Sequence, residues 1–370
     1  MTARSAEDLR AGWRPASPPT ASTRRLPSRD AGTSPCQPRA GPLGQPASPC
    51  RGGAHLSGTT LAPPPPPRHS RAMKQGPKIG IALGSGGARG WCHIGVLRGL
   101  ERLGIRPDVV AGTSMGAVVG AAHAAGRLDA LEEWVRALTP ARVVMLMDLK
   151  LRAGGLVEAR ELVAMLERLG IAPRIEDLGL PFTAVATAMQ TGREVWLSSG
   201  PTYRAVRASA GIPGVMTPVR IGGRWMLDGG LTNPVPVSAA RAMGADIVIA
   251  VNPNGKRHGR IWQPPKAREA RPLLATLLPE SLHDPLGIDP TPKPRETAPN
   301  YFSVLTAAID VMSDTILRTR LAGDPPHVFL EAVLPDLTVL ELYRGAEAIA
   351  EGERMVAARA EEIRAVLEDW

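Results

Sequence analysis

A serine flanked by glycines is the residue best placed in this sequence for nucleophilic chemistry. Residues 112–116 read Gly-Thr-Ser-Met-Gly, the Gly-x-Ser-x-Gly pattern of a nucleophile elbow, in which a sharp strand-to-helix turn exposes a serine hydroxyl. The motif follows the apolar run 109–111 and precedes a helical run of small residues, which is the context that this turn requires. Gly112 and Gly116 are expected because a side chain at either position would collide within the turn. Ser114 is the candidate nucleophile for acyl transfer.

A glycine-rich loop upstream, residues 84–90 (Gly-Ser-Gly-Gly-Ala-Arg-Gly), could bind an anion through its backbone amides. The loop joins an apolar run to a helical pattern, so its N–H groups would converge at the positive end of a helix dipole, where a phosphate or a developing oxyanion is stabilised. A dinucleotide fingerprint would need Gly or Ala at position 89, which is Arg89, and a P-loop would need Gly-Lys-Ser/Thr, which is absent. Taken alone, the loop leaves an oxyanion site and a purely structural tight turn both open.

A serine nucleophile needs a base, and the candidate is Asp228, which ends the short strand expected at 224–227 and precedes Gly229 and Gly230. An Asp before two glycines is by itself typical of a turn. Its occurrence after the two other motifs favours the role of base.

Strand and helix patterns alternate from residue 78 onward and must position these motifs. Apolar runs predict strands at 79–83, 109–111, 182–188, 193–197, 246–251 and 327–333. Periods of three and four predict helices at 91–103, 115–126, 129–138, 159–169, 202–209, 235–243, 301–320 and 344–368. The alternation predicts an α/β domain with a largely parallel, helix-covered sheet.

Composition separates a tail from a folded domain. The chain has 370 residues, 44% of them hydrophobic, and a net charge of +9. Residues 1–72 contain 14 of the 37 prolines, ten arginines and three acidic residues, so +7 of the charge belongs to this segment. We expect 1–72 to be disordered, with Met73 as an alternative start, and 73–370 to form the folded domain, interrupted by a mobile Pro-rich loop at about 252–300. The proline run 63–67 could bind a partner domain as a polyproline ligand, or have no binding role. The net charge of residues 73–370 gives no electrostatic argument that the domain binds nucleic acid.

Other counts exclude further classes of protein. Three cysteines support neither a disulfide framework nor a zinc site, so we expect no metal, no cofactor and a reducing, cytoplasmic setting. The sequence contains no uninterrupted run of about 18 apolar residues, so it predicts no membrane-spanning helix. Residues 1–25 have no apolar segment of the kind found in a secretory signal.

The three motifs in this order resemble the patatin-like phospholipase family. The resemblance runs from about Lys78 to Pro253 and more loosely to Glu331, and is similar to bacterial members of the type linked to stationary-phase regulation. It implies a three-layer α/β/α fold, a Ser114–Asp228 dyad and a lipid or other carboxylic ester as substrate. The other implied site residues are an oxyanion hole of Gly86, Gly87 and Ala88, supported by Gly84, Arg89, Gly90, Gly112, Gly116, Gly229 and Gly230. Many members open the first motif with Asp-Gly-Gly-Gly, and this chain departs from that pattern with Gly84-Ser85-Gly86-Gly87.

Several alternatives stay open. An α/β-hydrolase would use Ser114, Asp228 and a late histidine such as His327, although only one strand precedes the elbow's own strand. A catalytically idle scaffold or regulatory protein could share the fold. His93 could be a base or a structural histidine under the loop, beside Cys92 as a small core residue.

Two further residue sets have open roles. Arg89 could contact a substrate phosphate or position its loop. The apolar stripe of the 301–320 helix (Phe302, Leu305, Ile309, Met312, Ile316) could pack in the core, or contact the inner face of a membrane with Arg318 and Arg320 on lipid head groups. The sequence does not predict the oligomeric state.

Overall fold

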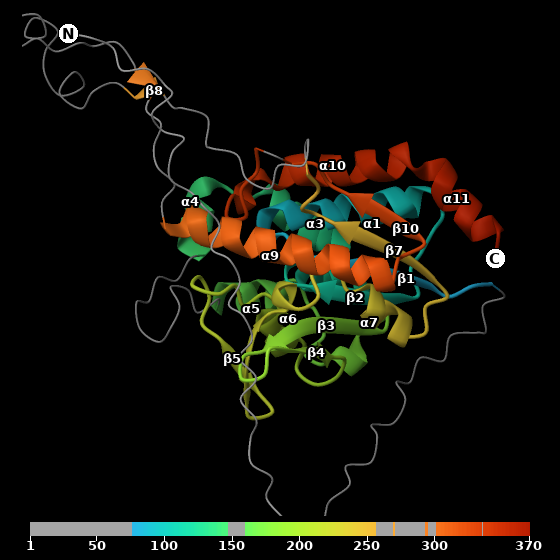
Figure 1. The fold of residues 1–370 in the computed structure, drawn as a ribbon, viewed down its shortest axis with the longest axis horizontal. Coiled ribbons are helices and arrows are strands. Elements are labelled where there is room, and N and C mark those ends of the chain that lie inside the picture. The colour runs from blue at the N-terminus through green and yellow to red at the C-terminus, as the bar shows by residue number, and fades with distance from the viewer. Residues whose placement is uncertain (1–75, 147–159, 257–268, 271–292, 295–300, 335) are drawn as a thin grey trace, which may run out of the picture. The chain divides into compact units, whose positions relative to one another are not determined.

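An eight-stranded sheet organises the part of the chain that the computed structural model describes, which comprises residues 76–146, 160–256, 269–270, 293–294, 301–334 and 336–370 (Figure 1). The strand order is β10-β7-β1-β2-β3-β6-β5, and β4 pairs with β3. The bounds are β1 Ile79–Leu83, β2 Val109–Thr113, β3 Phe182–Ala188, β4 Arg193–Leu197, β5 Val219–Ile221, β6 Arg224–Asp228, β7 Ile247–Asn252 and β10 Val328–Glu331. The predicted tail at 1–72 lies outside the described residues. So does most of the predicted loop at 252–300, within which β8 (Glu269–Ala270) and β9 (Lys293–Pro294) pair.

The sheet is parallel from β10 to β3 and antiparallel where β3, β4, β5 and β6 pair. The central strands β1, β2 and β7 are buried along their whole length, which explains their continuous apolar sequences. β4 instead is exposed or partly exposed at residues 193–196 and buries only Leu197. The predicted largely parallel sheet is confirmed.

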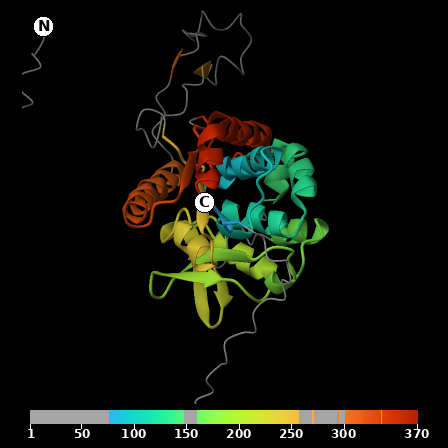
Figure 2. The same ribbon diagram turned by 90° about the vertical axis from the view of Figure 1, so that its right-hand side faces the viewer.

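Helices cover both faces of the sheet and give the predicted three layers (Figures 1 and 2). Alternate residues of β7 show the division: Ile249 and Val251 pack with the larger apolar cluster, and Val248 and Ala250 with the smaller one. The helices of the larger cluster include α1 Cys92–Arg102, α2 Met115–Ala124, α3 Leu128–Arg136, α5 Arg160–Arg168, α6 Thr202–Ser209, α10 Gly345–Ala358 and α11 Ala360–Glu368. The smaller cluster includes α7 Val237–Ala242 and α9 Tyr301–Gly323. α4 spans Pro140–Leu146, and short 3₁₀ turns occur at Gly87–Trp91, Ile175–Asp177, Gly229–Leu231 and Leu342–Arg344. No described helix has the length and apolar character needed to cross a bilayer.

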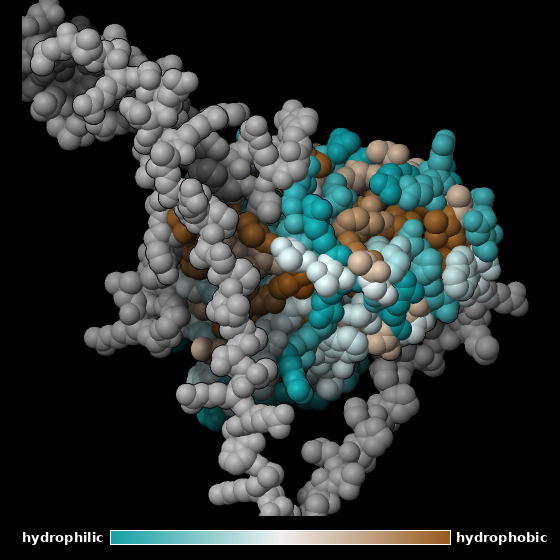
Figure 3. All heavy atoms as spheres, viewed as in Figure 1, coloured by the Kyte–Doolittle hydropathy of each residue, from teal (hydrophilic) through white to brown (hydrophobic). Residues whose placement is uncertain are grey.

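One prediction about helices is corrected. The single helix expected at 344–368 is two helices, because the chain leaves helical geometry at Arg359 (φ −118°), and the second helix then buries Ile363. On α9, for whose apolar stripe the sequence left both core packing and membrane contact open, Met312 is 51% exposed, whereas Ser313 and Leu317 are buried. Hydrophobic surface over α9 is visible in Figure 3. α4 and β5 were not expected from the sequence.

Helices α1 and α10 lie side by side and touch through glycines (Figure 2). A Cβ atom added to Gly352 would lie 2.0 Å from the Cys92 carbonyl oxygen, and one added to Gly95 would lie 1.9 Å from that of Ile349. Backbone meets backbone at both positions, so no flexible side chain can move aside.

We expect Gly352→Ala to lower the free energy of unfolding by roughly 2 kcal/mol or more, because the overpacked methyl group outweighs the better helix propensity of alanine. Urea denaturation would measure the change. Gly323→Ala at the end of α9 is the matched control, because nothing lies within 4 Å of its added Cβ atom. Equal stability of the two variants would show that the helices can separate at no cost.

Candidate active site

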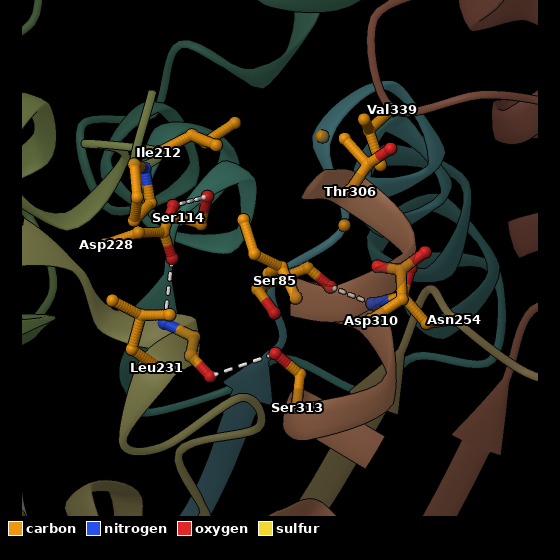
Figure 4. Close-up of a pocket in the computed structure, with 15 residues that line it drawn as sticks. Ser85, Ser114, Ile212, Asp228, Leu231, Asn254, Thr306, Asp310, Ser313 and Val339 are labelled. Carbon is orange, nitrogen blue, oxygen red and sulfur yellow. Dashed lines mark hydrogen bonds between the residues drawn. The ribbon is translucent and has the colours of Figure 1, made fainter. Parts of the chain in front are cut away.

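The ends of β2 and β6 meet beside β3 and bring Ser114 to Asp228. Thr113 of β2 pairs with Val185, and Asp228 of β6 pairs with the next residue of β3, Ala186. Ser114 and Asp228, which are 114 residues apart in sequence, are joined by a hydrogen bond of 2.6 Å from Ser114 Oγ to Asp228 Oδ2 (Figure 4).

Ser114 stands on the sharp turn that its motif predicts. Its φ of 56° and ψ of −120° make it the one non-glycine residue with positive φ in the described part of the chain. A Cβ atom on Gly112 would lie 2.4 Å from the Gly116 carbonyl oxygen, and one on Gly116 would lie 2.0 Å from that of Leu83. Both glycines are therefore required by close approach.

Ser209 holds the elbow and was not anticipated from the sequence. The Ser114 amide donates to Ser209 Oγ at 2.9 Å, and the Ser209 hydroxyl donates to the Val185 carbonyl at 2.5 Å. Ser209 is buried at the end of α6 and links the strained turn to β3. A serine that ends a helix 95 residues after the elbow carries no local signal of this contact.

Asp228 is a buried carboxylate with few compensating donors. Oδ2 accepts from Ser114, and Oδ1 accepts from the Gly230 amide at 2.7 Å. Burial raises the pKa of Asp228 to about 6, and the hydrogen bonds from Ser114 and Gly230 offset only part of this effect. Gly229 makes a close approach instead: its added Cβ atom would lie 2.2 Å from the Val185 carbonyl oxygen.

The glycine-rich loop offers two uncommitted amides. Gly86 and Gly87 line the same cavity as Ser114, and no hydrogen bond joins their N–H groups to another described residue. The Ala88 amide donates to the Val339 carbonyl at 2.9 Å, so Ala88 can serve an oxyanion as predicted only if that bond opens. Gly84 and Gly90 permit close packing, because their added Cβ atoms would lie 2.7 Å from the Val251 oxygen and 2.6 Å from Met115 Cβ.

Side chains and carbonyls brace this loop from distant segments. Arg89 donates to the Leu337 carbonyl, to Asn254 Oδ1 at 2.7 Å and to Asp310 Oδ2 at 3.0 Å, which supports the role of positioning the loop. The Ser85 carbonyl accepts from Asn254 Nδ2 at 2.8 Å, so the departure at Ser85 leaves the loop braced. The Trp91 indole donates to the Leu342 carbonyl at 3.1 Å.

No histidine among the described residues contacts the pair. His93 is buried, its Nε2 lies 2.8 Å from the Gly84 carbonyl oxygen, and burial lowers its pKa to about 4, as suits a structural histidine under the loop. His327 precedes β10, at the amino-terminal edge of the parallel strands, whereas Ser114 follows the carboxyl end of β2. His327 and Ser114 therefore lie at opposite ends of the parallel strands. At that separation His327 cannot serve as the histidine of an α/β-hydrolase triad with Ser114. Cys92 is buried, and burial raises the pKa of its thiol.

Two cavities meet at Ser114, and Gly87, Ile212 and Val339 also line both. One, of about 120 Å³, is largely apolar and continues past Trp91, Trp134, Leu162, Met165 and Val215. The other, of about 50 Å³, has a mixed lining, in which Asp228, Asn254, Asp310 and Ser313 stand among aliphatic side chains such as Leu231 and Ile212 (Figure 4). The described residues contain no cluster of three or more His, Cys, Asp or Glu side chains that could hold a metal ion.

Comparisons with known proteins find relatives of this chain. The family model described as Patatin-like phospholipase matches residues 81–241, which include Ser114 and Asp228. An uncharacterized NTE family protein of Mycobacterium tuberculosis is 34% identical over 327 residues, covering 75% of this chain and 90% of the relative. Human patatin-like phospholipase domain-containing protein 6 is 34% identical over 184 residues, covering 48% of this chain but only 13% of that protein. The crystal structure of VipD from Legionella pneumophila matches with a TM-score of 0.37 and 14% identity over 80% of this chain and 67% of that one.

The raised pKa of Asp228 predicts that Asp228→Asn stabilises the folded protein. An acid whose pKa rises from 3.8 to about 6 on folding costs stability above the folded pKa and nothing below the unfolded one. We expect a gain of up to roughly 3 kcal/mol at pH 8 that shrinks as the pH falls from 6 to 4. Denaturant titrations at pH 4 and pH 8 would measure it. A variant less stable than the parent at pH 8 would mean that the carboxylate's hydrogen bonds outweigh its burial cost.

Proposed function

Because the chain belongs to the patatin-like phospholipase family, we propose that it is a serine acyl hydrolase that cleaves carboxylic esters of lipids, with Ser114 as nucleophile and Asp228 as base. The observation that carries this proposal is the 2.6 Å hydrogen bond from Ser114 Oγ to a buried carboxylate oxygen. Membership of the family supports lipid hydrolysis in general, and the dyad is the finer part of the proposal.

The proposed reaction has two halves. Ser114 Oγ attacks the ester carbonyl carbon while its proton passes to Asp228 Oδ2, and the amides of Gly86 and Gly87 stabilise the tetrahedral oxyanion. The bond from carbon to the alcohol oxygen then breaks, and that oxygen takes the proton from Asp228. Water attacks the acyl-enzyme and gives a proton to Asp228. The second tetrahedral intermediate collapses, Ser114 Oγ regains the proton, and the carboxylic acid leaves.

The two cavities suit the two parts of a lipid ester. The larger one, with its tryptophan and aliphatic lining, would take the acyl chain, since burying methylene groups there removes apolar surface from water.

The raised pKa of Asp228 suits the role of base. A carboxylate with a pKa of about 6 is a stronger base than an ordinary Asp and is still ionised at neutral pH, which is what a dyad without imidazole needs.

Contact with a lipid surface is part of this proposal. The face of α9 that points away from the site exposes Val304, Val311 and Met312 at 54%, 48% and 51%. The same helix lines the smaller cavity with Thr306, Ile309, Asp310 and Ser313. An apolar surface on an element of the site is well placed to meet the substrate's bilayer.

Labelling with a fluorophosphonate tests the nucleophile. Ser114 is expected to be the one serine labelled, and Ser114→Ala to abolish both labelling and ester hydrolysis while the circular dichroism spectrum is unchanged. His327→Gln is the matched control and should retain substantial turnover. Persistent labelling of the Ser114→Ala variant would refute the assignment, and an unlabelled, inactive parent would favour an idle scaffold.

The rate should follow the ionisation of Asp228. Because the base must be charged in the free enzyme, kcat/KM should fall about tenfold per pH unit below pH 6 and level off above it, with no second ionisation from a histidine. Asp228→Asn should lose several orders of magnitude in kcat at every pH. Rates measured with a soluble ester from pH 4.5 to 8.5 would decide; an unchanged profile in the Asn variant would require another base.

A further inference from the structure

Two β-hairpins extend past Ser114 at the edge of the sheet where the site lies. β2, which ends just before Ser114, pairs with β3 as far as Val185, whereas β3 continues to Ala188 before it turns back as β4. Three further residues of strand span roughly 10 Å. The turn between β5 and β6 lies farther out still, because β6 pairs with the last residues of β3. We call residues 189–193 and 220–225 the hairpin tips; they lie in the lower part of Figure 1, near the labels of β3, β4 and β5.

The exposed charge of the two hairpins is entirely basic. Three arginines at the tips are exposed: Arg193, Arg220 and Arg224. The hairpins also contain two carboxylates, but Asp228 is buried and Glu194 forms an ion pair with Arg320 of α9 at 2.6 Å. None of the three exposed arginines forms an ion pair with a carboxylate in the described part of the chain. The tips therefore present positive charge that the described residues do not compensate.

Large apolar side chains adjoin these arginines. Trp225 is 44% and Met189 57% exposed, and the two are neighbours, because the Met189 amide donates to the Trp225 carbonyl at 2.8 Å. Arg220 pairs with Trp225 across the second hairpin, so both side chains project from the same face. A tryptophan beside arginines is typical of a surface that meets a bilayer, where the indole lies among the head groups and guanidinium groups bind phosphate.

α9 does not supply such cations. Its exposed apolar residues belong to the proposed contact with lipid, but the two arginines near its end are engaged: Arg318 binds Asp314 at 2.9 Å and Arg320 binds Glu194. A surface that attracts an anionic bilayer needs basic groups that are not already neutralised. Among the elements around the site, the hairpin tips meet this requirement.

We propose that the hairpin tips bind the surface of a bilayer that contains anionic phospholipids, with the arginines on the head groups and Trp225 and Met189 at the level of the upper acyl chains. The inference rests on the proposed hydrolysis of lipid esters, whose substrate it places in an anionic bilayer. Because the tips extend past Ser114 on its own edge of the sheet, docking through them holds the site next to the lipid.

Sedimentation with vesicles tests the charge. The probes are vesicles of phosphatidylcholine alone and of phosphatidylcholine with about 30% phosphatidylglycerol, which carries the negative charge. We expect the double variant Arg220→Gln, Arg224→Gln to bind the anionic vesicles about tenfold or more weakly than the parent, and the difference to shrink in high salt. Residues 1–72 are present in every variant, so their ten arginines add the same background to each measurement.

The matched control for charge is the double variant Arg106→Gln, Arg364→Gln. Both arginines are exposed and lie outside the hairpins, and no described carboxylate pairs with them. This variant loses the same charge and should bind anionic vesicles as the parent does. An equal loss in both double variants, or no loss in the hairpin variant, would overturn the proposal. Arg224→Gln alone, expected to weaken binding about fivefold, gives the same test if the double variant does not fold.

A second pair of variants tests the apolar contact. Trp225→Ala should weaken binding to both kinds of vesicle, whereas Trp370→Ala should not, although Trp370 is more exposed at 62%. Trp370 stacks on His327, at the opposite end of the parallel strands from Ser114. Equal effects of the two changes would overturn the role of the tips.

The remaining outcomes separate this surface from the proposed function. Sedimentation velocity without lipid that showed a dimer of the parent and a monomer of the hairpin variant, with unchanged vesicle binding, would overturn the proposal in favour of an interface between copies. Normal fluorophosphonate labelling of Ser114 with vesicle binding that does not depend on the hairpins would overturn the surface alone. Binding to vesicles as expected, but with no labelling and no ester turnover, would overturn the proposed function.

Discussion

The hydrogen bond between Ser114 and Asp228 is the interaction on which the arrangement of the site depends. A carboxylate can activate a serine without imidazole only if it is held at contact distance and partly deprived of water. The fold meets the first need by ending β2 and β6 at consecutive residues of β3, and the second by burying Asp228. Both needs oppose stability, because the turn at Ser114 is strained and the buried charge has few donors. The packing of the surrounding sheet and helices must therefore supply the stability that keeps the strained turn and the buried carboxylate in place.

Ser114 lies where two cavities with different linings meet. The larger is lined by aromatic and aliphatic side chains, and the smaller by a mixture of aliphatic side chains with hydroxyl, amide and carboxylate groups. The lining of the larger cavity comes largely from helices of the larger core cluster, and the polar groups of the smaller one come from strand ends and the inner face of α9. A nucleophile at this boundary is compatible with the proposed lipid ester, in which the acyl chain and the alcohol lie on different sides of the carbonyl carbon.

Local patterns in the sequence predicted the elements and the motifs, and contacts between distant segments account for what was missed. The strands 79–83, 182–188 and 193–197 and the helix 202–209 agree with β1, β3, β4 and α6 because short buried runs and helical periods are local properties. Ser209, Val339 and Asp310 gave no signal, since each acts on a loop or elbow at least 95 residues away. The break at Arg359 was missed for a similar reason: the pattern showed a continuous helix, and the core decides where Ile363 must point.

The bracing of the glycine-rich loop has a consequence for synthesis of the protein. The carbonyls of Leu337, Val339 and Leu342 accept hydrogen bonds from Arg89, Ala88 and Trp91, and 248 residues separate Arg89 from Leu337. A ribosome that has released both Ser114 and Asp228 has therefore not yet supplied the partners that fix this loop. Helix α10, which packs against α1 through Gly352, emerges later still. The nascent chain thus carries the proposed nucleophile and base before the loop proposed to stabilise the oxyanion is fixed, so the proposed site is assembled only after the segment from Leu337 to Gly352 has been made.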